Sequence, residues 1–289
     1  METQIIQVPY DSGQKDFGMG NGPAHLVRHG LASLPGVGVG GIEVEQQPFE
    51  WGTTLRVLSA LAEEVGAAAQ GNRFALVLAG NCMSSVGTLA GLSAPSPARS
   101  LGIVWLDAHA DFNTPETTVS GFLDGMALAT ATGRCWQNLT ASIHGFRPVL
   151  EKNVVLIGAR DLDREERNLL RHSAVASIDA ATLRKRSIND VVAPAIEAFA
   201  AESVYLHIDL DVLDRSEARV NEYSSSGGLT LAELLEIVRV VGAARPLAAA
   251  AITAYDPAHD NDGKALRAAT ALIKELVTIS RQSLARADG

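Results

Sequence analysis

Short, continuously apolar runs alternate along the chain with longer stretches of helical periodicity. Apolar runs of about five residues, rich in β-branched side chains, predict strands that are buried on both faces, as in a parallel sheet between two layers of helices. The runs are FALVLAG (74–80), SLGIVWLD (100–107), NVVLIGARD (153–161), SVYLHIDLD (203–211) and PLAAAAITAYD (246–256).

The segments between these runs predict crossover helices. Thr230 followed by Glu233 predicts a capping box ahead of LLEIVRVV, and residues 264–285 predict a closing helix. The segment 55–70 places its apolar positions on one stripe of a helix: Leu55, Leu58, Leu61 and Val65. Alternating strands and helices predict a three-layer α/β fold, a mostly parallel β-sheet flanked by helices, whose sites open at the carboxyl ends of the strands.

Composition favours one globular domain over residues 1–289. The chain is 47% hydrophobic and 20% charged, and it contains no internal repeat, charge block or low-complexity tract. No window has the roughly 18 uncharged apolar residues of a membrane span. The N-terminus, METQIIQVPYDSG, lacks the basic start and the apolar run of a signal peptide. We therefore expect a cytoplasmic protein with no membrane partner.

Charge and cysteine content narrow the partners further. A net charge of −9 repels phosphate backbones, and no basic stripe interleaved with aromatic residues overrides it. Nucleic acid is therefore not expected as a partner. Cys82 and Cys135 are too few for a disulfide framework, although one bridge is possible.

Two apolar runs end in carboxylates rather than in turn residues. Asp107, His109 and Asp111 are spaced so that an extended chain would place their side chains on one face, and Asp209 and Asp211 repeat the pattern. So many close carboxylates cannot all ionise unless a cation balances them. Oxygen-rich sites with one imidazole favour Mn²⁺ or a similar ion. Two such ions about 3.5–4 Å apart can trap a water and make it nucleophilic near neutral pH.

Each motif also has a purely structural interpretation. A single D-x-D at a strand end is often a helix cap or a loop anchor, and a single histidine is often structural. His109 lies between two carboxylates directly after an apolar run, which a cap does not explain. Together the two motifs favour a metal site.

With these residues the sequence resembles the ureohydrolase superfamily of arginases, agmatinases and formiminoglutamases. The most specific match is DAHADFNTPETTVSGFLDG (107–125), which resembles the family's D-A-H-x-D-x-N-T-P block. Four further segments resemble family motifs: GMGNGPAHLVRHGL (18–31), LAGNCMSSVG (78–87), HIDLDVLD (207–214) and SGGLT (226–230). The resemblance implies a parallel-sheet α/β fold, a binuclear Mn²⁺ site, hydrolysis of a linear non-peptide C–N bond, and a homo-oligomer, usually a trimer or hexamer.

The resemblance also implies roles for the acidic residues. Asp107 and Asp209 would bridge two metal ions. His109 and Asp211 would complete one metal site, and Asp111 the other. Asp111 would also hydrogen-bond the attacking water, which makes it a candidate catalytic residue.

Further positions match the substrate-binding residues of arginases. Asn113, Thr118 and Ser120 match the stretch that holds an α-carboxylate, and Asp163 matches an acidic residue near the α-amino group. This resemblance implies an amino-acid substrate with a guanidino-type group. Ordinary loop hydrogen bonding is the alternative role for these side chains.

Cys82 and Asp124 depart from the family pattern. Cys82 stands where a histidine ligand is usual; as a thiolate it would ligate a metal, and otherwise it is an apolar filler beside a single-metal site. Some relatives with this cysteine act on Nω-hydroxyarginine. Asp124 occupies the position of a proton-shuttling histidine and would need a raised pKa to act there; otherwise it is a solvated turn residue.

Ala254 is the third departure. It stands where the family has a glutamate that binds the guanidinium, and a methyl group cannot neutralise a cation. A less basic hydroxyguanidino group, or a neutral ureido or amide group, would fit better. Glu222 or Tyr223 could substitute for the missing carboxylate, or be ordinary loop residues.

These observations predict a metal-dependent amidinohydrolase that acts on a guanidino or hydroxyguanidino amino acid and releases urea or an analogue. Two alternatives remain open at this stage. One is a degenerate homologue that binds metal or ligand without turnover. The other is a hydrolase of a neutral amide or formimino substrate.

Overall fold

The described structure is a computed structural model that covers residues 2–94 and 100–287. Its centre is an eight-stranded sheet in the order β4-β1-β5-β10-β9-β6-β7-β8, and every pair of neighbouring strands is parallel. The strands are β1 (Glu2–Val8), β4 (Val37–Gly41), β5 (Arg73–Ala79), β6 (Leu101–Leu106), β7 (Val154–Ile157), β8 (Ala176–Ile178), β9 (Ser203–Asp209) and β10 (Leu247–Thr253). A separate small ribbon pairs β2 (Tyr10–Asp11) with β3 (Gln14–Lys15).

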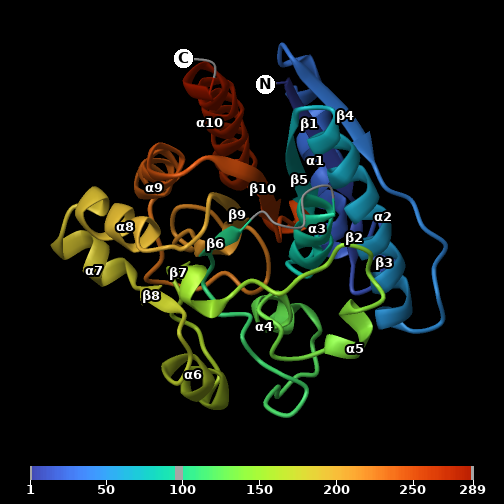
Figure 1. Cartoon of the computed structure of the whole chain (residues 1–289), viewed down its shortest axis with the longest axis horizontal. Coiled ribbons are helices and arrows are strands. Elements are labelled where there is room, and N and C mark those ends of the chain that lie inside the picture. The colour runs from blue at the N-terminus through green and yellow to red at the C-terminus, as the bar shows by residue number, and fades with distance from the viewer. Residues whose placement is uncertain (1, 95–99, 288–289) are drawn as a thin grey trace.

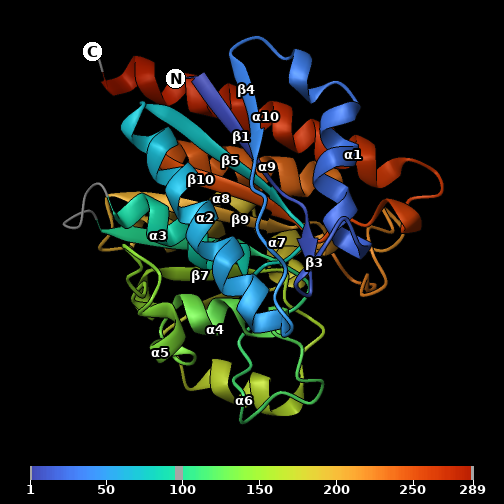
Figure 2. The same ribbon diagram turned by 90° about the vertical axis from the view of Figure 1, so that its right-hand side faces the viewer.

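Helices cover both faces of this sheet, with α2 and α3 on the side opposite to α9 and α10 (Figures 1 and 2). The α-helices are α1 (Gly22–Arg28), α2 (Glu50–Gln70), α3 (Ser84–Ser93), α4 (Ala127–Ala131), α5 (Gln137–Thr140), α6 (Arg164–Arg171), α7 (Ala180–Lys185), α8 (Ile188–Glu197), α9 (Leu231–Ala244) and α10 (Lys264–Ala287). The short 3₁₀ helices are η1 (Gly18–Asn21), η2 (Leu31–Ser33), η3 (Asp124–Met126), η4 (Glu151–Asn153), η5 (Leu210–Val212) and η6 (Pro257–His259). The predicted three-layer α/β fold is confirmed.

Residues of β5 explain why the central strands are apolar throughout. Phe74, Leu76 and Leu78 pack into the core beneath α1, α8, α9 and α10. The alternate residues of the same strand, among them Val77, pack into a second core beneath α2 and α4. Because both faces of the strand are buried, neither set of positions can be polar.

All five predicted strands are present, but they end earlier than the apolar runs suggested. β6 stops at Leu106 and β7 at Ile157, so the carboxylates that follow these strands lie in loops. The capping box of Thr230 and Glu233 is confirmed at the start of α9, and the closing helix is α10. The sequence did not predict β1, β4 and β8. For two of them the reason is local: β4 is glycine-rich, and only one of the three residues of β8 is buried. Among the described residues, none of the helices combines the length and apolar character needed to cross a membrane.

Candidate metal centre

The candidate site lies at the carboxyl ends of five adjacent strands. In sheet order, β5 leads to Cys82, β10 to Ala254, β9 ends in Asp209, β6 leads to Asp107, and β7 is followed by the loop that contains Asp163. Residues that are far apart in sequence therefore meet at one edge of the sheet, where open α/β sheets place their sites.

The D-A-H-A-D segment reaches the site through a loop and not as an extended strand. Asp107 directly follows β6, and its Oδ1 accepts a hydrogen bond from the His109 N–H at 2.7 Å. Its Oδ2 accepts another from the Trp105 indole N–H at 2.9 Å. Asp111 has a φ of 49°, in the left-handed region that costs a non-glycine residue energy. The expectation that strand alternation aligns these residues was therefore wrong, because a turn brings them together.

A tight turn also arranges the second acidic pair. Asp209 is the last residue of β9, and Asp211 lies in η5. The Asp209 Oδ1 accepts a hydrogen bond from the Asp211 N–H at 2.8 Å, so one carboxylate caps the turn that contains the other. The Asp211 Oδ1 accepts from the Ala108 N–H at 3.2 Å, which joins this turn to the first acidic loop. The cap and the metal-ligand interpretations are therefore compatible here.

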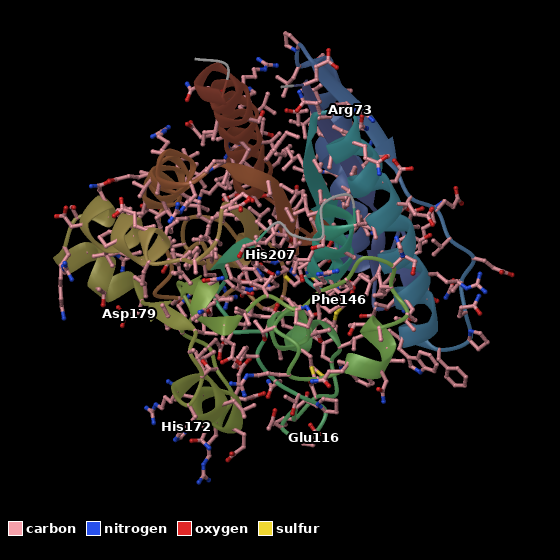
Figure 3. The ribbon with its side chains drawn as sticks, viewed as in Figure 1. Arg73, Glu116, Phe146, His172, Asp179 and His207 are labelled. Carbon is pink, nitrogen blue, oxygen red and sulfur yellow. The ribbon has the colours of Figure 1, made fainter. Side chains whose placement is uncertain are left out.

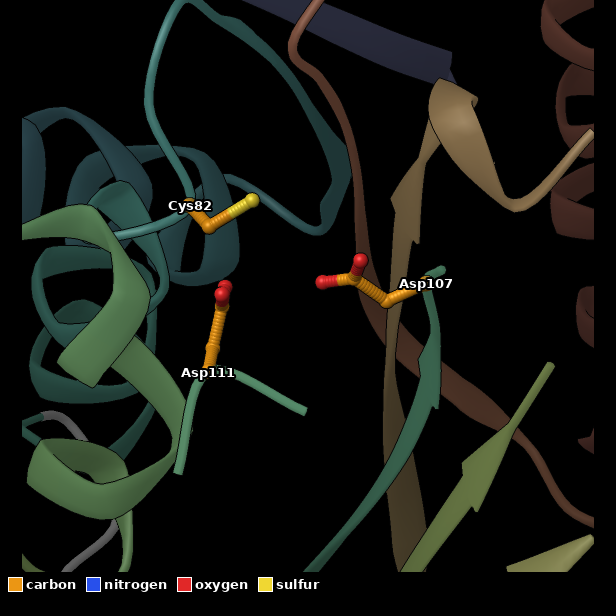
Figure 4. A group of neighbouring side chains, drawn as sticks. All are labelled: Cys82, Asp107 and Asp111. Carbon is orange, nitrogen blue, oxygen red and sulfur yellow. The ribbon is translucent and has the colours of Figure 1, made fainter. Parts of the chain in front are cut away.

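Two groups of potential ligand atoms converge, and Asp107 belongs to both. Cys82, Asp107 and Asp111 each offer one atom within 4.8 Å of the others, and so do Asp107, His109 and Asp211. Figure 4 shows the Cys82 sulfur and the two carboxylates of the first group turned toward a common space. The shared carboxylate is what a bridge between two ions requires.

The carboxylates of this cluster are buried close to one another. Burial, reinforced by the neighbouring carboxylates, raises the pKa values of Asp107, Asp111 and Asp209. Oδ2 of Asp111 is buried and has no hydrogen-bond partner. The His109 Nδ1 lies 3.3 Å from an oxygen of Asp107 and 3.3 Å from one of Asp211, and although burial alone would lower the pKa of His109, these carboxylates raise it. An orphaned oxygen and an imidazole nitrogen between two carboxylates fit a bound divalent cation.

Cys82 is buried at the inner end of this cluster. Its thiol donates to the Asp209 Oδ2 at 3.1 Å and lies 3.1 Å from the Thr253 hydroxyl. Burial and the Asp209 charge raise the pKa of the thiol. A cation next to Asp209 would reverse this shift, because a positive charge stabilises the thiolate. The sulfur is therefore placed where a ligand could be, although an apolar filler would also be buried there.

Behind the acidic residues lies a buried aromatic platform. His207, which Figure 3 labels at the centre of the molecule, stacks on Trp105 with ring centroids 3.6 Å apart. Burial lowers the pKa of His207 to about 3, so the ring is neutral near pH 7. Its Nε2 lies 3.4 Å from the Thr253 hydroxyl, the same hydroxyl that contacts Cys82. The platform thus contacts the acidic centre at two points. Trp105 hydrogen-bonds Asp107, and His207 lies next to the Thr253 hydroxyl that contacts Cys82.

Asp124 lies in the same cavity and is not the solvated turn residue that was one alternative. The side chain is buried. One carboxylate oxygen accepts from the Met83 N–H at 2.6 Å, and the other accepts from the Asn81 amide at 3.0 Å. Burial raises the pKa of Asp124 to about 7, against the opposing effect of these hydrogen bonds. The raised pKa that a proton-transfer role requires is therefore present.

A cavity of about 240 Å³ is lined by the candidate metal and substrate residues other than Asp107, which is not among its lining residues. Among its lining residues are Cys82, His109, Asp111, Asn113, Thr118, Ser120, Asp124, Asp163, Asp209, Asp211 and Ala254. Asn113 donates to Asp163 at 3.2 Å. Thr118 and Ser120 accept hydrogen bonds from the nearby Gly121 and Phe122 N–H groups, as ordinary loop residues do. The proposed substrate residues are thus brought together, while their local bonds also fit the structural interpretation.

Sequence reasoning missed several residues of this cavity. Glu166 is buried, accepts from the Phe112 N–H at 2.9 Å, and has its pKa raised to about 7 by burial. Its position three residues after Asp163, as in a capping box, was the available signal. Of the two candidates on the loop before α9, Tyr223 lines the cavity and Glu222 is not among its lining residues; the role of either stays a prediction. Met19, Phe122 and Asn221 also line the cavity and carried no sequence signal.

Known proteins resemble the chain along nearly its whole length. The sequence model of the arginase family matches residues 1–278. An arginase of Bacillus caldovelox is 31% identical over 293 residues, covering 94% of this chain and 96% of that protein. The crystal structure of arginase from Bacillus subtilis superimposes with a TM-score of 0.84 at 29% identity, over 96% of this chain and 98% of the other.

A more distant structural relative shares the fold. The agmatine ureohydrolase of Thermoplasma volcanium has a TM-score of 0.74 at 17% identity, over 99% of this chain and 91% of that one. At this identity the likeness concerns the architecture alone. The arginase comparisons, by contrast, match in sequence as well as in fold.

Proposed function

This chain belongs to the arginase family of hydrolases acting on non-peptide C–N bonds, and from this premise we propose that it is a Mn²⁺-dependent amidinohydrolase of a hydroxyguanidino amino acid. The products would be urea or an analogue, plus an amine. The observation that carries the proposal is the convergence of buried acidic ligands at the end of a substrate-sized cavity, with one carboxylate shared by two groups.

The residues present fit two divalent ions. Cys82, Asp107, Asp111 and Asp209 would hold one, and Asp107, His109, Asp209 and Asp211 the other. When bound, the ions would supply Lewis-acid activation of a water near neutral pH and would balance the carboxylates. Mn²⁺ suits a site of oxygen atoms and one imidazole, whereas the Cys82 sulfur favours a softer ion and would weaken Mn²⁺ binding on its side.

Two carboxylates are placed to handle protons. Asp111 has an unpartnered oxygen facing the cluster, which can accept a hydrogen bond from the attacking water. Asp124 lies on the cavity wall with its carboxylate held by Asn81 and Met83. It is the group that would protonate the departing amine in place of the histidine usual in the family.

The residues that line the cavity favour a substrate whose reacting group is weakly basic. Ala254 lines the cavity and offers no charge to a guanidinium. Hydroxylation lowers the basicity of a guanidino group, so a hydroxyguanidino group loses less from this change. The same cavity also has polar lining residues for the other end of the substrate. Asp163 and Glu166 offer acceptors for an α-amino group. The side chains of Asn113, Thr118 and Ser120 offer polar groups to an α-carboxylate.

Metal content and urea release test this function together. We expect protein from Mn-supplemented medium to hold metal and to release urea from Nω-hydroxyarginine faster than from arginine or agmatine. Asp209→Asn should abolish both metal binding and turnover, while Asp190→Asn, at an exposed helix position, should change neither.

The alternatives give different results. Metal without urea from any of the three compounds would favour a neutral amide or formimino substrate, and no metal at all would favour a degenerate homologue that only binds ligand. Retained activity in Asp209→Asn would contradict the proposed bridge.

We also propose that residues 1–289 form one domain and that the protein is a homo-oligomer, a trimer or hexamer. The family model supports the single domain because it spans almost the whole chain. Light scattering should give a mass three or six times that of one chain, and a monomer would contradict the oligomer.

A further inference from the structure

Two aromatic side chains from different loops meet on the cavity wall. Phe122 comes from the loop that follows the D-A-H-A-D segment, and Tyr223 comes from the loop between β9 and α9. Their rings stack with centroids 5.9 Å apart and planes inclined by 28°. Tyr223 also meets the ring of His109, at 6.4 Å and nearly at a right angle. The aromatic pair therefore adjoins the candidate metal ligands.

The side chain of Asn221 connects Tyr223 to Ala254, the residue that stands in place of the family's glutamate. Asn221 donates from its amide to the Ala254 carbonyl at 2.9 Å, and its Oδ1 accepts from the Tyr223 N–H at 3.0 Å. These two hydrogen bonds engage both the amide nitrogen and the amide oxygen of Asn221, so the side chain is not the group that binds a ligand. Tyr223 and Ala254 are thus tied to one another through a single buried residue.

Charge is distributed unevenly around this cavity. Among the described residues that line it are several carboxylates and neither lysine nor arginine, while Met19, Phe122, Tyr223 and Ala254 contribute uncharged side chains. A planar group that enters beside His109 meets the aromatic pair of Phe122 and Tyr223, and Ala254 offers it no carboxylate. Guanidino groups are planar, delocalised and weakly hydrated, and they stack on aromatic rings.

Resting on the proposed function, we propose that Tyr223, supported by Phe122, is the specificity-determining residue that binds the planar face of the substrate's hydroxyguanidino group. Stacking depends less on full charge than an ion pair does. The wall therefore accepts a group whose basicity is lowered by hydroxylation. Tyr223 binds the group and takes no part in proton transfer, so its contribution falls on substrate binding and not on the chemical step.

Calorimetric binding of Nω-hydroxyarginine to the Mn²⁺-loaded protein, together with steady-state kinetics, tests this proposal. Tyr223→Leu should weaken binding and raise KM by roughly 2- to 30-fold, the range that runs from an exposed to a desolvated contact between a guanidino group and an aromatic ring, with kcat changed less than threefold. Tyr223→Phe keeps the ring and should bind like the wild type. Phe122→Leu should give a smaller loss than Tyr223→Leu. Val119→Ala, at an exposed position of the Phe122 loop, is the matched control and should change nothing.

Several outcomes would overturn the proposal. Unchanged binding in Tyr223→Leu would remove the ring from recognition. An equal loss in Tyr223→Phe and Tyr223→Leu would assign recognition to the hydroxyl instead. Binding that depends on Tyr223 without urea release would support the stacking and contradict only the proposed reaction, whereas absence of binding to the wild type would contradict both.

Discussion

Cys82 belongs to one of the two groups of possible ligand atoms, and we propose that its sulfur holds one of the ions. A thiolate is a weaker partner for Mn²⁺ than an imidazole, and the thiol pKa is raised by burial. Cys82→His should therefore increase occupancy of the second metal, measured as metal per chain, and should increase turnover of plain arginine.

The second cysteine offers a matched control for this change. Cys135 is also buried but lines a different hollow, with Trp51 and Trp136. Cys135→Ala should leave both metal content and turnover unchanged. If Cys82→His alters neither quantity, Cys82 is a filler beside a single ion.

Ala254 lines the cavity with a methyl group, which offers no charge to a cation. Its φ of 62° is unusual for a non-glycine residue and costs about 1–2 kcal/mol. The strain is already present in the natural chain, so Ala254→Glu should add little further backbone cost. We expect the glutamate to lower KM for arginine several-fold, with a smaller effect on the hydroxylated substrate.

The position of Ala254 in the cavity is what this substitution tests. Ala258→Glu, at an exposed position of η6, adds the same charge outside the cavity and should leave KM unchanged. An unchanged KM in Ala254→Glu would mean that the substrate's basic end lies elsewhere in the cavity.

At the scale of elements, the sequence predicted strands better than the loops between them. The runs that became β5, β6 and β9 are apolar because both faces are buried, a constraint that is local in sequence. The turn at Asp111 depends on contacts with distant chain, such as the Ala129 N–H that donates to the Asp111 carbonyl. Residue types therefore predicted which side chains form the centre, but their spacing predicted the wrong backbone path.

Arg160 shows how distant elements fix the acidic turn. Its guanidinium donates to six backbone carbonyls and, within the described part of the chain, to no carboxylate: the carbonyls are those of Gly158, Asp211, Val212, Leu213, Ser225 and Ser226. A Cβ at Gly228 would lie 2.6 Å from its Nη2 and also 2.6 Å from the Asp214 nitrogen and the Val212 carbonyl oxygen, and these backbone contacts explain a glycine of the SGGLT motif. The arginine thus joins the turn that contains Asp211 to the loop that leads into α9.

Removal of this guanidinium should loosen both segments. Arg160→Met leaves several half-buried carbonyls without a donor, and we expect a loss of about 2–3 kcal/mol in the free energy of unfolding. Metal affinity should fall as well, and Arg160→Lys should recover part of each. Arg164→Met, whose parent side chain is 96% exposed, is the control. A folded Arg160→Met protein with normal metal affinity would restrict this arginine to holding the loop.

At the scale of the whole molecule, strand order creates the site. The strands that supply Cys82, Ala254, Asp209 and Asp107 are neighbours in the sheet but are scattered along the chain. No local pattern encodes the order β5-β10-β9-β6, because it depends on how the crossovers pack. The convergence was nevertheless predictable from chemistry, since several buried carboxylates need one common cation. The stacking of Phe122 on Tyr223 could not be predicted in this way, because both residues stand in loops and follow no periodicity, although Tyr223 was one of the two candidates that the sequence suggested on its loop.

We expect the acidic centre to make the stability of the molecule depend on a bound cation. Without a cation, the buried carboxylates must be held by protons and by His109, which lies 3.3 Å from oxygens of both Asp107 and Asp211. A metal that binds only the folded protein, at 100 times its Kd, stabilises it by about 2.7 kcal/mol. For a chain of this size, removal of the metal with a chelator should lower Tm by roughly 5–10 °C, and added Mn²⁺ should restore it.

Variants of Asp209, which we propose as a ligand of both ions, separate metal binding from general destabilisation. In Asp209→Asn the Tm should no longer respond to chelator or Mn²⁺, whereas Asp190→Asn should respond like the wild type. Removing one buried charge also relieves repulsion, so metal-free Asp209→Asn should be at least as stable as the metal-free wild type. If the chelator leaves the wild-type Tm unchanged, the pairing of His109 with its two carboxylates is enough to hold the centre, and a cation is not part of what stabilises this fold.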